Sequence, residues 1–154
     1  MNYIENEKSF LERIKIKFNR RFAKTEYGKS WTKDNYWYNK IHDSNPLIHQ
    51  NFINYLKEKT NVTNILEVGC GAGIYPIKMK DLFSRMQYTG IDISQSAIDY
   101  CKKNSQYEFI CGDFIKMDLN KKYDLVYSHA VVDHVYDIDK FISKIIVKIG
   151  RAHV

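Results

Sequence analysis

The 154-residue sequence has few cysteines, no long apolar run and no dense basic tract. Its three cysteines, Cys70, Cys101 and Cys111, lack C-x-x-C spacing, so we expect reduced, small hydrophobic side chains rather than disulfides. No apolar stretch reaches the roughly 20 residues of a membrane-spanning helix. The polar, acidic start also differs from a secretory signal. These absences predict a cytoplasmic protein without a membrane span.

Positive charge is concentrated at the N-terminus. Residues 1–40 hold ten Lys and Arg against five Asp and Glu, within a chain whose net charge is +6. An amphipathic helix is expected over residues 8–23, with most basic side chains away from its apolar face. Such a helix could attract a nucleic acid or an acidic surface. Because basic runs with interleaved stacking aromatics are absent, a nucleic-acid partner is the less favoured interpretation.

The most informative motif is a short apolar run followed by alternating glycines. Residues 65–68 read as a strand covered on both faces, interrupted only by Glu67. A carboxylate at the end of such a strand is either a ligand-facing group or a cap for the helix that follows. Gly69, Gly71 and Gly73 then allow a tight turn and close approach of the backbone to a ligand. The order of strand, glycine turn and helix predicts a nucleotide-like cofactor.

The glycine spacing separates two classes of cofactor. A dinucleotide-binding turn has the form Gly-x-Gly-x-x-Gly, whose third glycine would fall at Ile74. Here that glycine lies one residue earlier, at Gly73, and the pattern is Glu-x-Gly-x-Gly-x-Gly. The pattern resembles the first motif of the class I S-adenosylmethionine-dependent methyltransferases. An NAD(P)-dependent dehydrogenase has the same order of strand, glycine turn and helix, so it remains an alternative.

A second apolar run, residues 88–93, ends in a carboxylate. Asp92 lies nineteen residues after Gly73, about the distance at which an acidic residue meets a ribose edge. We therefore expect Asp92, with Ile93 beside it, to contact the cofactor. Ser94 then has the character of a helix N-cap.

Two further runs extend the resemblance over roughly residues 64–148. The run 109–111 leads into Asp113 and Phe114. In the family, an aspartate at this position accepts a hydrogen bond from the adenine amino group, and the resemblance implies that Asp113 does so here. The run 123–128 resembles the fourth strand of the family, which implies that Ser128 lies beside the methionine part of the cofactor.

Three polar residues after the fourth run are candidates for proton transfer from an acceptor: His129, Asp133 and His134. The alternative is that they face solvent or cap the next helix. Two histidines five residues apart with one aspartate match no usual zinc spacing, so no metal is expected. A base is needed only if the acceptor must lose a proton, and its identity cannot be derived from this pattern.

The first 60 residues are expected to form a helical and aromatic lid. Trp31, Tyr36 and Trp37 lie in a stretch with little periodicity. Segments ahead of the first strand often fold over the cofactor in the family, which implies a role in covering the sulfonium or binding the acceptor. The equally open alternative is that these rings pack the N-terminal helix onto the sheet.

The expected architecture is α/β, with a Rossmann-like, doubly wound and mostly parallel sheet. Residues 61–148 would supply strands 1 to 4 of a partial domain, with helices over 47–58, 74–86 and 138–149. The family has seven strands in the order 3-2-1-4-5-7-6, so strands 5 to 7 are missing. The tail 149–154 resembles what a common sequencing adapter encodes in one reading frame. We therefore expect a C-terminally truncated reading frame with a non-native tail.

The resemblance implies an S-adenosylmethionine-dependent methyltransferase with S-adenosyl-L-methionine as cofactor. The acceptor is unidentified, and a small molecule or metabolite is favoured. Besides the dehydrogenase, a non-catalytic S-adenosylmethionine-binding fragment remains an alternative. The oligomeric state is not predicted by any feature of the sequence.

Overall fold

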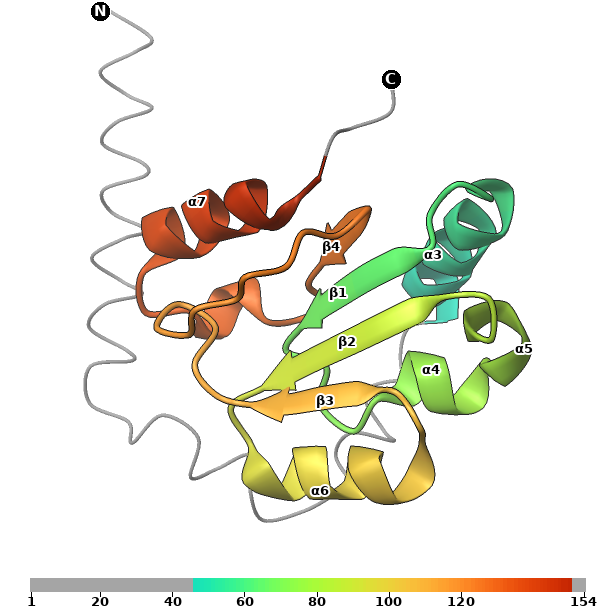
Figure 1. The fold of residues 1–154 in the computed structure, drawn as a ribbon, viewed down its shortest axis with the longest axis horizontal. Helices are drawn as coiled ribbons and strands as arrows, with labels where there is room; N and C mark the ends of the chain where they lie inside the picture. The colour runs from blue at the N-terminus through green and yellow to red at the C-terminus, as the bar shows by residue number, and fades with distance from the viewer. Residues whose placement is uncertain (1–45, 151–154) are drawn as a thin grey trace, which may run out of the picture.

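The computed structural model describes residues 46–150 (Figure 1). The helix predicted over residues 8–23 lies outside the described residues. So do the lid candidates Trp31, Tyr36 and Trp37, and residues 151–154 of the predicted tail.

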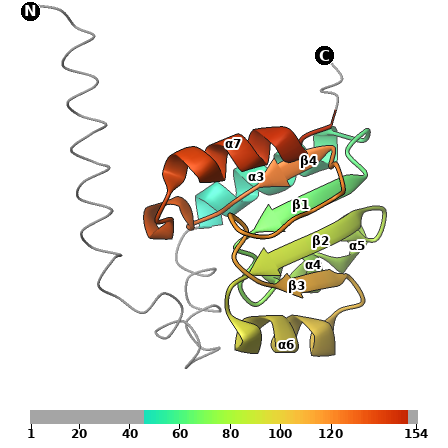
Figure 2. The same cartoon turned by 60° about the vertical axis from the view of Figure 1, so that its left-hand side comes forward.

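The described residues form a four-stranded sheet with helices around it. In chain order the elements are α3 (Pro46–Glu58), β1 (Asn64–Val68), α4 (Ile74–Lys78), α5 (Lys80–Phe83), β2 (Gln87–Asp92), α6 (Gln95–Asn104), β3 (Glu108–Cys111), β4 (Leu125–Tyr127), the 3₁₀ helix η1 (Val132–His134) and α7 (Ile138–Lys148). The strand order is β3-β2-β1-β4, and every pairing is parallel. Figure 2 shows the four arrowheads at one end of the sheet. The predicted order 3-2-1-4 is confirmed.

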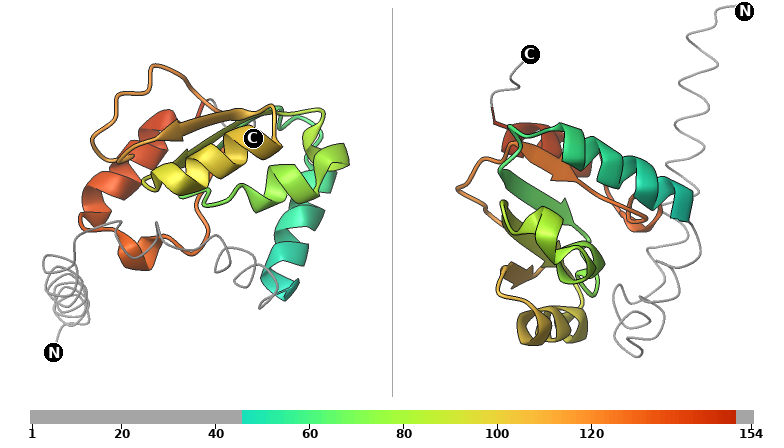
Figure 3. Two further views of the ribbon diagram at one scale, coloured as in Figure 1. Left: turned by 90° about the horizontal axis from the view of Figure 1, so that it is seen from below. Right: turned by 90° about the vertical axis from the view of Figure 1, so that its right-hand side faces the viewer.

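Helices cover both faces of the sheet. Side chains alternate along β1, so that Ile65 joins a core with Leu56 of α3 and Ile98 of α6. Leu66 points the other way, into a core with Phe141 of α7. Figure 3 shows α7 on one side of the sheet and α3 with α4 on the other. Burial on both faces explains why the first strand reads as an apolar run rather than an alternating one.

The helix predicted over residues 74–86 is two short helices. Met79 interrupts it with φ −115° and ψ 46°, outside the helical region. No glycine or proline marks the break. Tyr75 and Phe83, on either side of it, are both buried in the same core. Because the apolar spacing continues across Met79, periodicity alone could not reveal the interruption.

Asp124 has a structural role just before β4. Its Oδ2 accepts hydrogen bonds from the backbone N–H groups of Thr63 and Asn64, both at 2.9 Å, and from the Thr63 hydroxyl at 3.0 Å. The carboxylate thereby joins the entry to β4 to the entry to β1.

Among the described residues, β4 is an edge strand of the sheet. Just before it, Tyr123 forms an isolated parallel bridge with Ile149, and its carbonyl accepts a hydrogen bond from the Gly150 N–H at 2.8 Å. The first two residues of the predicted tail thus lie beside the edge strand.

Candidate functional site

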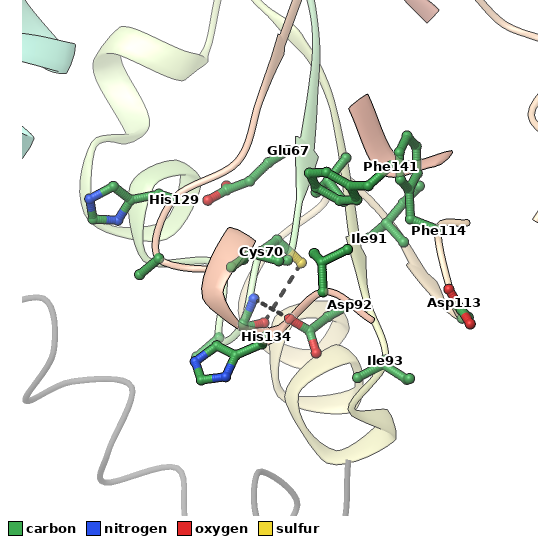
Figure 4. A pocket seen from close by; sticks show the side chains of 18 of the residues that line it. Glu67, Cys70, Ile91, Asp92, Ile93, Asp113, Phe114, His129, His134 and Phe141 are labelled. Carbon is green, nitrogen blue, oxygen red and sulfur yellow. Dashed lines mark hydrogen bonds between the residues drawn. The ribbon is translucent and has the colours of Figure 1, made fainter. Parts of the chain in front are cut away.

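A cavity of about 260 Å³ opens at the carboxyl ends of the strands (Figure 4). This is the position at which open parallel sheets bind ligands. The sequence-predicted residues that line it are Glu67, Gly69, Gly71, Asp92, Ile93, Asp113, Phe114, His129, Asp133 and His134. Gly73 and Ser128 are not among the residues that line the cavity. The lining residues that the sequence did not indicate include His49, Tyr75, Ile91, Val131, Val135 and Phe141.

The glycine turn after β1 has positive φ at each glycine. At Gly69, with φ 79°, an added Cβ would lie 2.1 Å from Cγ2 of Val131, so only glycine fits beneath the segment that follows β4. At Gly73, with φ 64°, an added Cβ would lie 2.9 Å from the Cys101 sulfur of α6. Gly73 therefore lets α4 begin close against α6, whereas Gly69 shapes the cavity wall.

Asp92 ties the glycine turn to the next helix. Its Oδ2 accepts a hydrogen bond from the Gly71 N–H, and its Oδ1 accepts one from the Ser94 N–H, both at 2.8 Å. Burial raises the pKa of Asp92, and the N–H donors of Ser94 and Gly71 oppose that rise. A carboxylate has about four acceptor positions, so this one keeps capacity for ligand hydroxyl groups. The predicted cap is present too, because the Ser94 hydroxyl accepts from the Ala97 N–H.

Glu67 is held by tyrosine hydroxyls from the strands on either side of β1. Tyr88 of β2 and Tyr127 of β4 both donate to its Oε2, the latter at 2.8 Å. The side chain is only 3% exposed. Burial raises the pKa of Glu67 from 4.5 to about 7, against the lowering effect of the two tyrosine hydrogen bonds. Glu67 thus faces the cavity, and its hydrogen bonds go to side chains rather than to a helix terminus.

The opposite end of the cavity is built around Asp113. Its Oδ1 accepts a hydrogen bond from the Ile115 N–H at 3.0 Å, and its Oδ2 accepts one from the Tyr136 hydroxyl at 2.9 Å. Beside it the buried rings of Phe114 and Phe141 meet edge to face, with centroids 5.6 Å apart. Apolar rings next to an acceptor carboxylate suit a flat heterocycle that carries an amino group.

The segment after β4 crosses over the glycine turn. Ser128 donates its hydroxyl to the Val68 carbonyl at 2.8 Å, which ties the ends of β4 and β1 together. Ala130 then adopts φ 55°, a left-handed conformation that is uncommon outside glycine. Asp133 and His134 follow in η1, with His134 Nε2 3.5 Å from Asp133 Oδ2.

Three residues from separate elements form what we call the histidine cluster: His49 of α3, Tyr75 of α4 and His129 after β4. His49 Nδ1 and the Tyr75 hydroxyl form a hydrogen bond. The ring centroids of His49 and His129 lie 4.8 Å apart, and those of Tyr75 and His129 lie 6.2 Å apart. His49 was missed because a histidine in the apolar stripe of a helix, in line with Phe52 and Leu56, gives no signal beyond core packing.

Within residues 46–150, no group of three or more His, Cys, Asp or Glu side chains is arranged to hold a metal ion. In the same part of the chain, no helix has the length and apolar character needed to cross a membrane.

Comparisons with known proteins give the family of the sequence and a fold like this one. Residues 59–149 match a family model described as a methyltransferase domain. The chain is 35% identical over 86 residues to a malonyl-[acyl-carrier protein] O-methyltransferase of Acetivibrio thermocellus, which covers 54% of this chain and 30% of that protein. It is 30% identical over 145 residues to a ubiquinone biosynthesis O-methyltransferase of Pelagibacter ubique, covering 82% of this chain and 59% of the relative. The matches therefore span between 30% and 59% of the length of these relatives.

A similar fold occurs in a solved structure, the plantazolicin methyltransferase BpumL in complex with a pentazolic desmethylPZN analog and SAH. The TM-score is 0.67 at 19% identity, over 92% of this chain and 57% of that one. The family match favours the methyltransferase interpretation over the dehydrogenase alternative. Since the match covers more than half of the sequence, the chain belongs to the class I S-adenosylmethionine-dependent methyltransferase domain family.

Proposed function

We propose that this chain binds S-adenosylmethionine and transfers its methyl group to a small-molecule acceptor. The observation that carries the proposal is the row of carboxylates along one cavity. Glu67 and Asp92 lie in the carboxyl ends of β1 and β2, Asp113 follows β3, and all three line the cavity. In Figure 4, Glu67 and Asp113 lie at opposite sides, with Asp92 between them. That order suits a ligand with an amino acid end, a ribose and a base.

The residues present fit this ligand end by end. Asp113 can accept from the adenine amino group, with Phe114 against the ring. Asp92 keeps acceptor capacity for ribose hydroxyls while it holds the Gly71 N–H. Glu67 places a carboxyl group at the end where the amino acid would lie. Bound S-adenosylmethionine would supply a methyl group activated by a positively charged sulfur. The protein would then orient the acceptor at attack distance, an effect worth up to about 10 kcal/mol in well-oriented reactions.

The names of the relatives support a small acceptor, because they refer to an acyl group on a carrier protein and to ubiquinone biosynthesis. His129, Asp133 and His134 all line the cavity and remain the candidates for taking a proton from such an acceptor. Trp31, Tyr36 and Trp37 remain predicted lid residues.

Calorimetric titration with S-adenosylhomocysteine and with NAD⁺ tests the proposal. We expect S-adenosylhomocysteine to bind and NAD⁺ not to bind. Asp92→Ala should weaken the binding of S-adenosylhomocysteine by about 2 to 4 kcal/mol, because ribose hydroxyls lose a charged acceptor and the Gly71 N–H loses its partner. Asp99→Ala, on the exposed side of α6, is the matched control. Preferential NAD⁺ binding, or an Asp92→Ala variant with unchanged affinity, would contradict the proposal.

A further inference from the structure

We propose that the histidine cluster binds the acceptor, that the acceptor is a phenol, and that His129 accepts the phenolic proton. This inference rests on the proposed methyl transfer and adds the class of acceptor. His129 would be the catalytic residue, and His49 and Tyr75 would be positioning residues that fix its ring.

The first argument is the convergence of three elements at one end of the cavity. His49, Tyr75 and His129 all line the cavity, and their rings contact one another. Figure 4 shows His129 on the same side as Glu67, away from Asp113 and Phe114. If adenine binds near Asp113, the reactive methyl group lies toward the histidine cluster. The cluster then lies on the side of the cavity where the acceptor would meet the methyl group.

The second argument is the difference in burial between the two imidazoles. His49 is only 6% exposed and is bonded to the Tyr75 hydroxyl. His129 is partly exposed. His129 is therefore the more accessible of the two imidazoles to an acceptor that arrives from solvent. His49 and Tyr75 instead form a fixed wall against which the His129 ring packs.

The third argument is the backbone strain immediately after His129. Ala130 has φ 55°, a left-handed conformation that is unfavourable for a residue with a Cβ. The turn lets Val131 pack down on Gly69 while His129 contacts His49. The strained residue thus directs two neighbouring side chains to two different walls of the same cavity.

The chemistry of the cluster favours a hydroxyl acceptor over a carboxylate. A phenol has a pKa of about 10 and must lose its proton during methylation, whereas a carboxylic acid is already ionised at neutral pH. Imidazole has a pKa of about 6.5 and is a base at neutral pH. Glu67 lies on the same side of the cavity, and its ionised form would repel an acceptor carboxylate while stabilising a protonated His129. Other titratable groups that line this cavity or bond to Glu67 include His49, Cys70, Tyr75, Tyr88, Asp92, Tyr127, Asp133 and His134.

The rings of the histidine cluster itself favour a flat acceptor. Phe52 and Tyr127 are not among the residues that line the cavity, but they pack against Tyr75, with centroid distances of 5.2 and 6.1 Å, and so hold its ring in place. Aromatic rings pack preferentially edge to face or offset against other rings. An aromatic acceptor that carries its hydroxyl toward His129 satisfies both the apolar and the polar part of this wall.

In the transfer step the methyl carbon exchanges its bond to sulfur for a bond to oxygen. A lone pair of the phenolic oxygen forms a bond to the methyl carbon, and the bond between that carbon and sulfur breaks. The electron pair of the broken bond stays on sulfur, which becomes the neutral thioether of S-adenosylhomocysteine. The phenolic proton passes to an imidazole nitrogen of His129 and later leaves to solvent.

The test uses three probes of matched shape: 4-methylphenol, 4-methylaniline and 4-methylbenzoate. Their binding to the full chain saturated with S-adenosylhomocysteine is measured by ligand-observed NMR at neutral pH. We expect the phenol to bind about tenfold more tightly than either of the other two. In His129→Gln this preference should fall to within about twofold, with binding of S-adenosylhomocysteine retained. Tyr75→Phe should lower the preference for the phenol partially and leave the binding of 4-methylaniline unchanged. A general structural loss would instead weaken the binding of both probes equally.

Each result decides between the two proposals. If S-adenosylhomocysteine does not bind the wild-type chain, the proposed function fails and the acceptor assignment fails with it. If S-adenosylhomocysteine binds and the phenol shows no preference, the acceptor assignment alone is overturned. It is also overturned if His134→Gln, rather than His129→Gln, removes the preference. Methylation of 4-methylphenol by S-adenosylmethionine, detected by mass spectrometry and lost in His129→Gln, would support it directly.

Discussion

The two ends of the cavity are built in different ways. One end is the proposed adenine end, defined by Asp113, Phe114 and Phe141, where Asp113 accepts from the N–H of Ile115, two residues along the chain. At the histidine cluster, the bond between His49 and Tyr75 joins residues 26 apart, and the neighbouring Glu67 receives Tyr127 from 60 residues away. Distant residues complete the first end too, since Tyr136 donates to Asp113 and Phe141 packs on Phe114, but there a local turn already holds the carboxylate. The histidine cluster has no such local contact among those described and forms only when distant elements pack. We therefore expect substitutions close to Asp113 in the chain to weaken the first end. Substitutions that disturb the packing of distant elements should weaken the second.

The largest expected effect comes from Gly69→Ala, which would disturb both ends. The new methyl group would lie 2.1 Å from Cγ2 of Val131, at a residue with φ 79°. We expect the free energy of unfolding to fall by about 3 kcal/mol, from left-handed strain together with overpacking. Urea denaturation measures it. The double variant Gly69→Ala with Val131→Ala should recover the packing part only. An unchanged unfolding midpoint in the single variant would show that the contact is not tight.

Next in size is a pH effect at the histidine end. The pKa of Glu67 is about 7 in the folded chain against 4.5 unfolded, so between those values the folded state keeps a proton that the unfolded state has released. Stability should therefore fall as pH rises from about 4.5 to 7, by up to about 3 kcal/mol, and change little above. Glu67→Gln should remove this slope. Urea denaturation across that range measures it, with Glu58→Gln on the exposed end of α3 as control. A slope that persists in Glu67→Gln would assign it to another group.

A smaller effect is expected at the adenine end. Asp113→Ala should weaken binding of S-adenosylhomocysteine by about 2 kcal/mol, because the adenine amino group loses a charged acceptor. Asp113→Asn should cost less, since its amide oxygen still accepts. Calorimetry gives both affinities. Equal losses would argue against direct contact with adenine and would remove the distinction between the two ends.

The smallest effect should follow Tyr136→Phe. The Tyr136 hydroxyl donates to Asp113 Oδ2 at 2.9 Å, so its loss removes one positioning hydrogen bond and leaves the carboxylate in place. We expect a loss of about 1 kcal/mol in S-adenosylhomocysteine binding. Tyr100→Phe, on α6, is the control for removal of a tyrosine hydroxyl elsewhere. If Tyr136→Phe binds more tightly, the hydroxyl competes with the ligand instead of orienting its acceptor.

The same contrast explains how far the sequence could be interpreted. The parallel strands and the positions of Asp92 and Asp113 were predictable, because each is set by an apolar run and the residues directly after it. The break at Met79 was not, since no residue type marks it. His49 and Tyr136 were not predictable either, because their roles arise from contacts across 26 and 23 residues. Sequence patterns relate residues that are close along the chain, whereas the residues that make these contacts are close only in the folded structure.

The two hydrogen bonds of Asp92 have a consequence for how a ligand would bind. Because the carboxylate already holds the Gly71 and Ser94 N–H groups, the turn after β1 and the start of α6 are joined before any cofactor arrives. The conformational entropy of that turn is lost during folding, so binding would not have to order it again. We therefore expect the cofactor to bind at this turn with little rearrangement of the backbone.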